Sequence, residues 1–249
     1  MSFKDHFSGH ADRYAAARPS YPSRLIDYIA DAAPGRSLVW DCGAGNGQAA
    51  VSLAQRFAAV RATDASAQQL AQASEHPRVT YRQAREDQSG LPDGAADLVT
   101  AAQAAHWFDL DKFYRECRRV LRTNGVVAVW CYGTHRVEPA IDEVTRLFYD
   151  GTLATYWPPE RAIVDRLYAA LDFPFEELDP PPFELHCDWR LGQLLDYIES
   201  WSATQRYRAT HNRSPMPELV EALTPLWGDP MQARAVRWPI GLRIGRVTP

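Results

Sequence analysis

The sequence predicts an α/β fold built on a doubly wound, mostly parallel sheet with an antiparallel strand near the C-terminal end. Two observations support this prediction. Between residues 37 and 132, short apolar runs alternate with amphipathic stretches, and a glycine-rich turn follows the first run. Alternating strand and helix segments of this length place helices on both faces of a parallel sheet.

The individual elements follow from the apolar pattern. The expected strands are the runs at 37–40, 59–63, 79–81, 97–101 and 126–130, and the expected helices between them are 48–57, 67–73 and 110–121. The last helix carries Leu110, Phe113, Cys117, Val120 and Leu121 on one face, at the spacing of an amphipathic helix. An earlier helix at 22–33 is expected to begin at Pro22 and to end before Pro34, because proline suits a first turn but cannot continue a helix.

The pattern changes after residue 133, and we expect one domain over residues 1–249. Its core is 35–133, a helical cap insertion covers about 134–182, and C-terminal helices and the last strands occupy 183–249. In that final part, strands are expected at 183–187 and 235–247, with helices at 191–202 and 218–227. Pro239 lies near the middle of the last run and predicts an edge strand or a bulge.

The overall composition argues against several classes of partner. The 27 basic and 31 acidic residues give a net charge of −4, which lacks the basic surface expected for nucleic acid. The four cysteines are far apart, so we expect reduced thiols in the cytoplasm. No signal peptide or apolar run of about 18 residues indicates a membrane, and scattered histidines and carboxylates predict no metal site.

The strongest local signal is the glycine-rich turn after the first apolar run. The three glycines are Gly43, Gly45 and Gly47, which is one residue tighter than the turn that dinucleotide folds prefer. Asp41 precedes them, and a carboxylate there repels a pyrophosphate but suits a cationic group. Asp64 ends the second run, where an acidic side chain accepts ribose hydroxyls. The combination predicts an adenosine ligand with an amino acid end.

Further segments strengthen this interpretation. They are 86–93 (EDQSGLPD), 102–108 (AQAAHWF) and 118–125 (RRVLRTNG). With the glycine turn, they resemble class I S-adenosylmethionine-dependent methyltransferases of the type 11 kind, and more narrowly the trans-aconitate methyltransferase-like branch. The resemblance covers about residues 3–132, and Thr123 and Asn124 depart from the family's R-V-L-x-P-G-G turn. It implies a Rossmann-like sheet with S-adenosyl-L-methionine as the cofactor and S-adenosyl-L-homocysteine as its product.

The resemblance also implies roles for individual positions. Asp41 and Gly43 would hold the methionine part of the cofactor, and Asp64 would hold the ribose. Asp87 would accept from the adenine amino group, or Glu86 in its place, because the alignment of that loop is uncertain by one residue. The Gln88 backbone N–H would bond to the adenine ring, and Gln103 would lie near the transferable methyl group.

Other residues are candidates for chemistry on the acceptor. His106 is a candidate general base, and the alternative is a histidine that caps the next helix or packs under Trp107. Arg18 is expected to pair with a carboxylate of the cofactor or substrate, and the alternative is a surface position. The expected substrate pocket consists of Tyr14, Tyr21, Trp107, Tyr132 and Trp201, aromatic residues that equally suit core packing.

The sequence therefore predicts methyl transfer to a small molecule, at an oxygen of a carboxylic or aromatic metabolite. One alternative is a cofactor-binding scaffold or regulator without transferase activity, because fold does not fix function. A nucleic-acid methyltransferase is disfavoured, because residues 102–105 lack the (Asn/Asp)-Pro-Pro-aromatic segment of base-methylating enzymes. A nicotinamide-dependent reductase is disfavoured by the glycine spacing. The sequence leaves open the acceptor, the oligomeric state and any movement of the cap.

Overall fold

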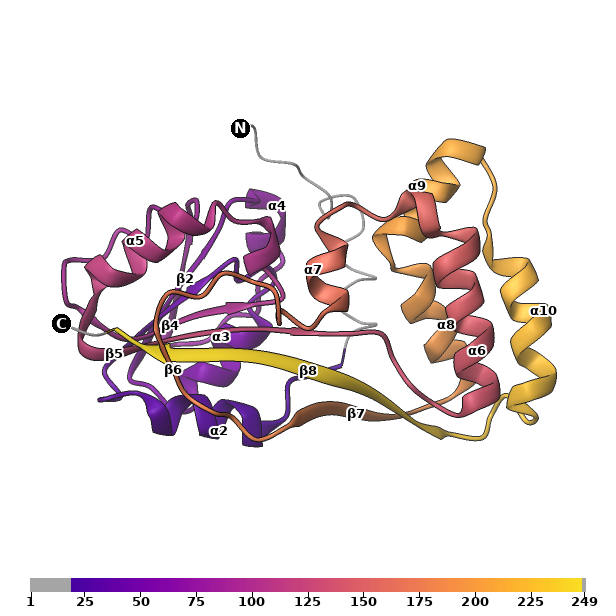
Figure 1. The fold of residues 1–249 in the computed structure, drawn as a ribbon, viewed down its shortest axis with the longest axis horizontal. Helices are drawn as coiled ribbons and strands as arrows, with labels where there is room; N and C mark the ends of the chain where they lie inside the picture. The colour runs from indigo at the N-terminus through magenta and orange to yellow at the C-terminus, as the bar shows by residue number, and fades with distance from the viewer. Residues whose placement is uncertain (1–18, 248–249) are drawn as a thin grey trace.

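The structure, a computed structural model, describes residues 19–247 and is organised by one mixed sheet (Figure 1). The strand order is β3 (Val79–Gln83), β2 (Ala59–Asp64), β1 (Leu38–Cys42), β4 (Ala96–Ala102), β5 (Leu121–Tyr132), β8 (Arg234–Arg246) and β6 (Glu176–Glu177), and β7 (Phe183–Trp189) also pairs with β8. The strands from β3 to β5 are parallel, and β8 is antiparallel to β5. The predicted fold class is confirmed.

Helices cover both faces of the parallel part of the sheet, as Figure 1 shows. On one face, α2 (Ser23–Ala32) and α3 (Gln48–Ala54) bury their apolar side chains against Val39 and Leu98. On the other face, α5 (Leu110–Val120) packs against Trp40 and Val99. Neighbouring residues of one strand, such as Val39 and Trp40, serve opposite faces because side chains alternate along a strand. The short helix α4 (Ala67–Leu70) follows β2.

A layer of helices lies beside the carboxyl ends of the strands (Figure 1). It consists of α6 (Pro139–Leu147), the π-helix η2 (Phe148–Thr152), η3 (Ala154–Tyr156), α8 (Leu191–Glu199), α9 (Ser202–His211) and α10 (Met216–Trp227). The apolar interior of this layer is continuous with the core beneath α2 and α3. Helix α7 (Arg161–Asp165) lies between the layer and the sheet and belongs to the α5 side of the core through Val164.

Strand β8 joins the two parts of the molecule. Its C-terminal half pairs with β5 and β6, and its N-terminal half pairs with β7. At Pro239, β8 pairs in a ladder with β7 alone, because the ladder with β5 ends at Ile240. Pro239 therefore lies at a local edge, as expected, and the register shows no bulge. Its nitrogen faces the side that β5 has left, where only the bond from the Gly133 N–H to the Pro239 carbonyl and a bridge between Arg136 and Arg237 continue.

Two local expectations change. The helix expected at 191–202 ends at Glu199, and Trp201 adopts extended backbone before α9 begins at Ser202. The turn into β5 contains Asn124 at φ 61°, where asparagine accepts the left-handed conformation that the related family fills with glycine. Asn124 therefore adopts a conformation that glycine would also adopt.

Candidate active site

The site forms where the strand order reverses. Strand β1 has β2 on one side and β4 on the other, and ligands of open α/β sheets bind at the carboxyl ends of strands at such a point. The loops after β1 and β4 touch there, because a Cβ added to Gly43 would lie 2.5 Å from Ala104 Cβ. These two loops carry Gly43, Gly45, Gly47 and Gln103 of the residues expected to bind the cofactor.

The glycine loop needs its glycines for backbone reasons. Gly43, Gly45 and Gly47 have φ values of +70°, +55° and +83°, a region that costs other residues free energy. The Gly43 N–H donates to the Thr63 carbonyl at 2.8 Å, which fastens the loop to β2. A Cβ on Gly47 would lie 2.0 Å from the Tyr81 hydroxyl oxygen. The predicted tight glycine turn is therefore present, and its role in binding a ligand stays a prediction.

Asp41 is a buried carboxylate with one oxygen left over. It is fully buried, and its Oδ1 accepts a hydrogen bond from Thr100 Oγ1 at 2.7 Å. Its Oδ2 has no hydrogen-bond partner among residues 19–247. Burial raises the pKa of Asp41 to about 7, against the hydrogen bond from Thr100 and with a smaller contribution from the charge of Asp64. A buried acceptor atom without a donor invites a cationic ligand group.

Asp64 fastens the far side of the glycine loop. Its Oδ2 accepts from the Gly45 N–H at 2.9 Å, and its Oδ1 accepts from the Ser66 N–H at 2.8 Å. Each carboxylate oxygen has two lone pairs, so these bonds are compatible with accepting ribose hydroxyls as well. The side chain is thus oriented by backbone amides at the end of β2.

The loop after β3 holds Glu86 and Asp87. The sequence analysis left open which of these two carboxylates accepts a hydrogen bond from the adenine amino group. Glu86 Oε1 accepts from the Asp109 N–H at 3.3 Å and lies 3.7 Å from Arg85. Asp87 Oδ1 is buried and has no hydrogen-bond partner within the described part of the chain. The Gln88 N–H donates to the Arg85 carbonyl at 3.1 Å. Asp87 therefore carries a buried acceptor without a partner, whereas Oε1 of Glu86 is already bonded.

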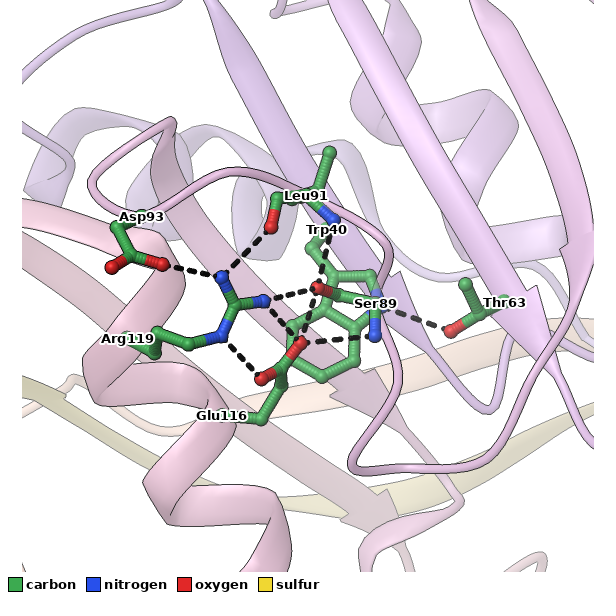
Figure 2. A network of polar contacts seen from close by, with 7 residues as sticks. All are labelled: Trp40, Thr63, Ser89, Leu91, Asp93, Glu116 and Arg119. Carbon is green, nitrogen blue, oxygen red and sulfur yellow. Dashed lines mark hydrogen bonds and ion pairs between the residues drawn. The ribbon is translucent and has the colours of Figure 1, made fainter.

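Figure 2 shows how this loop is fastened to α5. Glu116 accepts from the Ser89 N–H at 3.0 Å, and Arg119 donates to Glu116 at 2.7 and 2.8 Å. Arg119 also bonds to the Leu91 carbonyl at 2.9 Å and to Asp93 at 2.6 Å. Although burial opposes it, contact with Arg119 and Ser89 holds the pKa of Glu116 below its ordinary value. The sequence analysis did not identify this network, whose signal was the i, i+3 pair on α5.

Gln103 joins the ends of β4 and β5. It adopts φ 55°, and its N–H donates to the Trp130 carbonyl at 2.7 Å. Its side-chain Oε1 accepts from the Tyr132 N–H at 2.9 Å. A non-glycine residue in the left-handed region stores strain of a kind that clusters at functional sites.

His106 lies in the short helix η1 (Ala105–Trp107), directly after β4. Its Nδ1 is 2.8 Å from the hydroxyl oxygen of Tyr168. Burial, helped by the charge of Arg161, lowers the pKa of His106 to about 3, so the imidazole is neutral near pH 7. Tyr168 is fully buried, and it and Leu167 adopt φ values of 62° and 52°. No sequence signal had indicated Tyr168.

The aromatic residues expected in a substrate pocket divide between two places. Trp107 stacks near His106, with ring centroids 4.8 Å apart, and Tyr132 lies at the end of β5. Tyr21 packs edge-on against Trp130 at 5.5 Å. Trp201 lies in the helical layer, where its ring centroid is 5.6 Å from those of Tyr149 and Trp157. Tyr14 and Arg18 lie outside the described residues.

Comparison with known proteins identifies the family. The methyltransferase domain family matches residues 40–129. A putative methyltransferase of Dictyostelium discoideum is 33% identical over 225 residues, which cover 89% of this chain and 86% of that protein. The chain belongs to the class I S-adenosylmethionine-dependent methyltransferases. The narrower resemblance to the trans-aconitate methyltransferase-like branch stays a prediction.

Solved structures agree with this methyltransferase assignment. The structure of a putative type II methyltransferase from Anaeromyxobacter dehalogenans is 44% identical, with a TM-score of 0.88, over 93% of this chain and 99% of that one. The YcgJ protein of Bacillus subtilis shares the fold at 19% identity and a TM-score of 0.53. The family match at residues 40–129 runs from β1 into β5.

The buried acceptors of this methyltransferase fit its cofactor. S-adenosylmethionine carries a methyl group on a sulfonium, together with an ammonium, a ribose and an adenine amino group. The orphaned Asp41 Oδ2 and Asp87 Oδ1 are acceptors of the kind that ammonium and amino N–H groups satisfy. Within residues 19–247, no group of three or more His, Cys, Asp or Glu side chains is placed to share a metal ion. No helix in that range is long and apolar enough to cross a bilayer.

Proposed function

We propose that this methyltransferase transfers a methyl group to an oxygen of a small carboxylic or aromatic metabolite, with a carboxylate as the favoured acceptor. The observation that carries the proposal is the neutral His106 beside the carboxyl ends of the strands. An imidazole with a pKa of about 3 is a weak base. A carboxylate acceptor arrives already deprotonated, whereas a phenol or amine generally needs a base.

The cofactor residues are proposed on the geometry at the carboxyl ends of β1, β2, β3 and β4. Asp41 and Gly43 hold the methionine part, Asp64 holds the ribose, and Asp87 takes the adenine amino group. Gly45 and Gly47 shape the loop, the Gln88 segment borders the adenine, and Gln103 borders the methyl group. In such a site catalysis comes mainly from alignment of acceptor, methyl and sulfur, and alignment lowers barriers by as much as about 7–11 kcal/mol in well-oriented systems.

The remaining expected residues act on the acceptor in this proposal. His106 orients the acceptor by a hydrogen bond and has no need to remove a proton. Arg18 pairs with a carboxylate of the cofactor or the acceptor, and Trp107 and Tyr132 border the reacting oxygen. The helices of residues 134–182 form a cap together with α8, α9 and α10. Trp201 packs in the interior of that cap and supports the residues of the cap that face the acceptor.

We also propose a cytoplasmic location. The four cysteines within residues 19–247 form no disulfide, and three of them are buried, which suits a reducing compartment. A scaffold or regulator that binds cofactor without transferring a methyl group is the alternative function. It predicts saturable cofactor binding with no methylated product from any acceptor.

The first test is calorimetric titration of S-adenosylhomocysteine into the purified protein, with NADH as a parallel control. We expect one-to-one binding of the first compound and none of the second. Asp64→Ala is expected to weaken binding by about 1.5–3 kcal/mol, the usual cost of losing hydrogen bonds to a charged group. Asp31→Ala, an exposed carboxylate on α2, serves as the control and leaves binding unchanged.

An acceptor screen then tests the acceptor class. We expect methyl transfer to organic acids and little transfer to neutral amines. A panel in which amines are methylated while acids are untouched contradicts the proposed acceptor. Absence of S-adenosylhomocysteine binding by a folded sample contradicts the proposed cofactor residues as well.

A further inference from the structure

A pocket of about 320 Å³ opens between α7 and the η2–η3 segment. Its walls include Tyr149, Trp157, Pro158, Arg161, Ala162 and Asp165. Two aromatic rings and one guanidinium thus face a space large enough for a small metabolite. The sequence analysis singled out none of these side chains.

Arg161 is held on one edge only. Its Nε donates to Tyr149 Oη at 2.6 Å and to Asp165 Oδ1 at 2.9 Å. Its guanidinium carbon lies 5.0 Å from the centroid of the Trp157 ring and 5.4 Å from that of Tyr149. Neither Nη atom makes a hydrogen bond to any of residues 19–247. The arginine is therefore oriented by its neighbours while its two-pronged end remains available, the geometry that binds carboxylates in bidentate fashion.

The guanidinium is close to the end of the sheet where methyl transfer takes place. Helix α7 packs against η1, which carries His106. The charge of Arg161 contributes to the low pKa of His106 and also acts on Cys131 at the end of β5. The guanidinium is therefore near enough to His106 and to the end of β5 for its charge to act on both.

The charges around the pocket limit what it binds. Asp165 offsets the charge of Arg161, and Asp150, which also borders the pocket, lies 3.4 Å from Arg146. The walls are thus close to neutral before a ligand arrives. One negative charge on the Nη atoms is favourable, whereas several negative charges would face the two aspartates.

We propose that this pocket binds the acceptor as a flat monocarboxylic acid. The carboxylate lies on the Nη atoms of Arg161, and the unsaturated or aromatic body lies against Trp157 and Pro158. This inference rests on the proposed function, since it names the class of acid that the same site methylates. Polycarboxylic acids are excluded by the aspartates.

The test is binding of cinnamate, benzoate and indole-3-acetate, each compared with its amide, to protein saturated with S-adenosylhomocysteine. We expect at least one acid to bind with at least tenfold higher affinity than its amide. A tricarboxylic acid, citrate, is expected to bind more weakly than that acid. Calorimetry measures all three comparisons.

Variants separate recognition from folding. Arg161→Met is expected to weaken binding of the acid by about tenfold to a hundredfold and to leave binding of the amide unchanged, because charge-assisted hydrogen bonds are lost. Arg161→Lys keeps the positive charge but loses the paired N–H donors of the guanidinium. We expect an intermediate loss of affinity for the acid. Arg166→Met, an exposed arginine at the end of the same helix, is the matched control and changes neither affinity.

The outcomes separate the two proposals. S-adenosylhomocysteine binding by wild type and by Arg161→Lys reports on the cofactor site independently of the pocket. Retained cofactor binding, with acids bound no better than amides or unaffected by either Arg161 variant, overturns the pocket inference alone. If folded wild-type protein does not bind S-adenosylhomocysteine, the proposed function is overturned.

Discussion

The hydroxyl oxygen of Tyr168 lies 2.8 Å from Nδ1 of His106. The backbone N–H groups of Ala105 and His106 act on the same oxygen and oppose the rise in its pKa that burial causes. Because these donors favour an acceptor role for that oxygen, we infer that the hydroxyl donates its own proton to Nδ1. The neutral imidazole then carries its proton on Nε2, so His106 presents an N–H donor at its other ring nitrogen.

We predict that ¹⁵N NMR of wild type at pH 7 finds His106 neutral and protonated on Nε2. Tyr168→Phe removes the hydroxyl, mixes the tautomers and lowers the unfolding free energy by about 1–3 kcal/mol. We expect Tyr168→Phe to have a lower kcat and an unchanged KM for the cofactor. Tyr114→Phe, which loses a buried bond to the Asp172 carbonyl, costs similar stability without changing the tautomer. A charged His106 at pH 7 contradicts this account.

Asp41 makes cofactor affinity depend on pH. Its folded pKa of about 7 lies above the ordinary value of 3.8, so the folded protein without ligand holds a proton there below pH 7. The cofactor's ammonium favours the ionised form, and affinity therefore rises as pH increases from about 5 to about 7. Asp41→Asn is expected to bind S-adenosylhomocysteine more weakly and with a flat pH profile. Calorimetry at three pH values measures both, and an unchanged slope in the variant disproves the link.

The same shift affects stability with the opposite sign. Because the folded pKa of Asp41 is raised, its contribution is fully present below the unfolded pKa of 3.8 and is lost as pH rises through about 7. Asp188→Asn, which alters an exposed carboxylate, is the control for the calorimetric measurement of cofactor affinity. It should leave the slope of cofactor affinity against pH as in wild type.

Glu116 is expected to act on the cofactor site through the loop of residues 86–93. Glu116→Ala removes the acceptor of the Ser89 N–H and the main partner of Arg119. We expect a loss of about 1–3 kcal/mol in unfolding free energy and a higher KM for the cofactor at little change in kcat. The matched control is Glu143→Ala, which breaks an exposed i, i+3 pair with Arg146 worth about 0–1 kcal/mol. Equal effects of both variants on KM argue against a role for the network.

His135 is predicted to make the fold sensitive to acid. It is 3% exposed, and neither ring nitrogen has a hydrogen-bond partner within the described residues. Burial lowers the pKa of His135 to about 4, so between about pH 6.5 and 4 the unfolded chain binds a proton that the folded chain does not. Stability therefore falls as pH falls through this window.

His135→Phe is expected to flatten that dependence, since phenylalanine suits the surrounding rings of Tyr197, Trp201 and Trp238. Urea unfolding at pH 7 and pH 4.5 measures the difference. His186→Phe, an exposed histidine on β7, provides the comparison and should retain the wild-type slope. The same slope in His135→Phe as in wild type would refute the prediction.

The sequence predicts those structural features that depend on residues close together along the chain. The strands around Val39 and Val126 and the glycine turn at Gly43 follow from local apolar runs and from backbone requirements. Helix α9 was not predicted, because its segment lacks a regular apolar stripe, and the end of α8 before it depends on the extended backbone of Trp201.

The sequence analysis did not predict contacts between segments that are far apart along the chain. The Tyr168–His106 contact spans 62 positions and depends on two residues with positive φ that no sequence rule predicts. Arg161 likewise looks like any helical surface arginine in the sequence. Only folding brings it over Trp157 and Tyr149, so the sequence analysis looked to Arg18 for a carboxylate partner.

Strand β8 has a mechanical consequence. Its ladder runs without interruption from β5 in the core to β7, which leads into α8. A swing of the helical layer away from the core would have to break backbone hydrogen bonds along this ladder. We therefore expect the two halves of the molecule to move as one unit, and substrate and product to pass by small shifts of segments outside the ladder, such as α7.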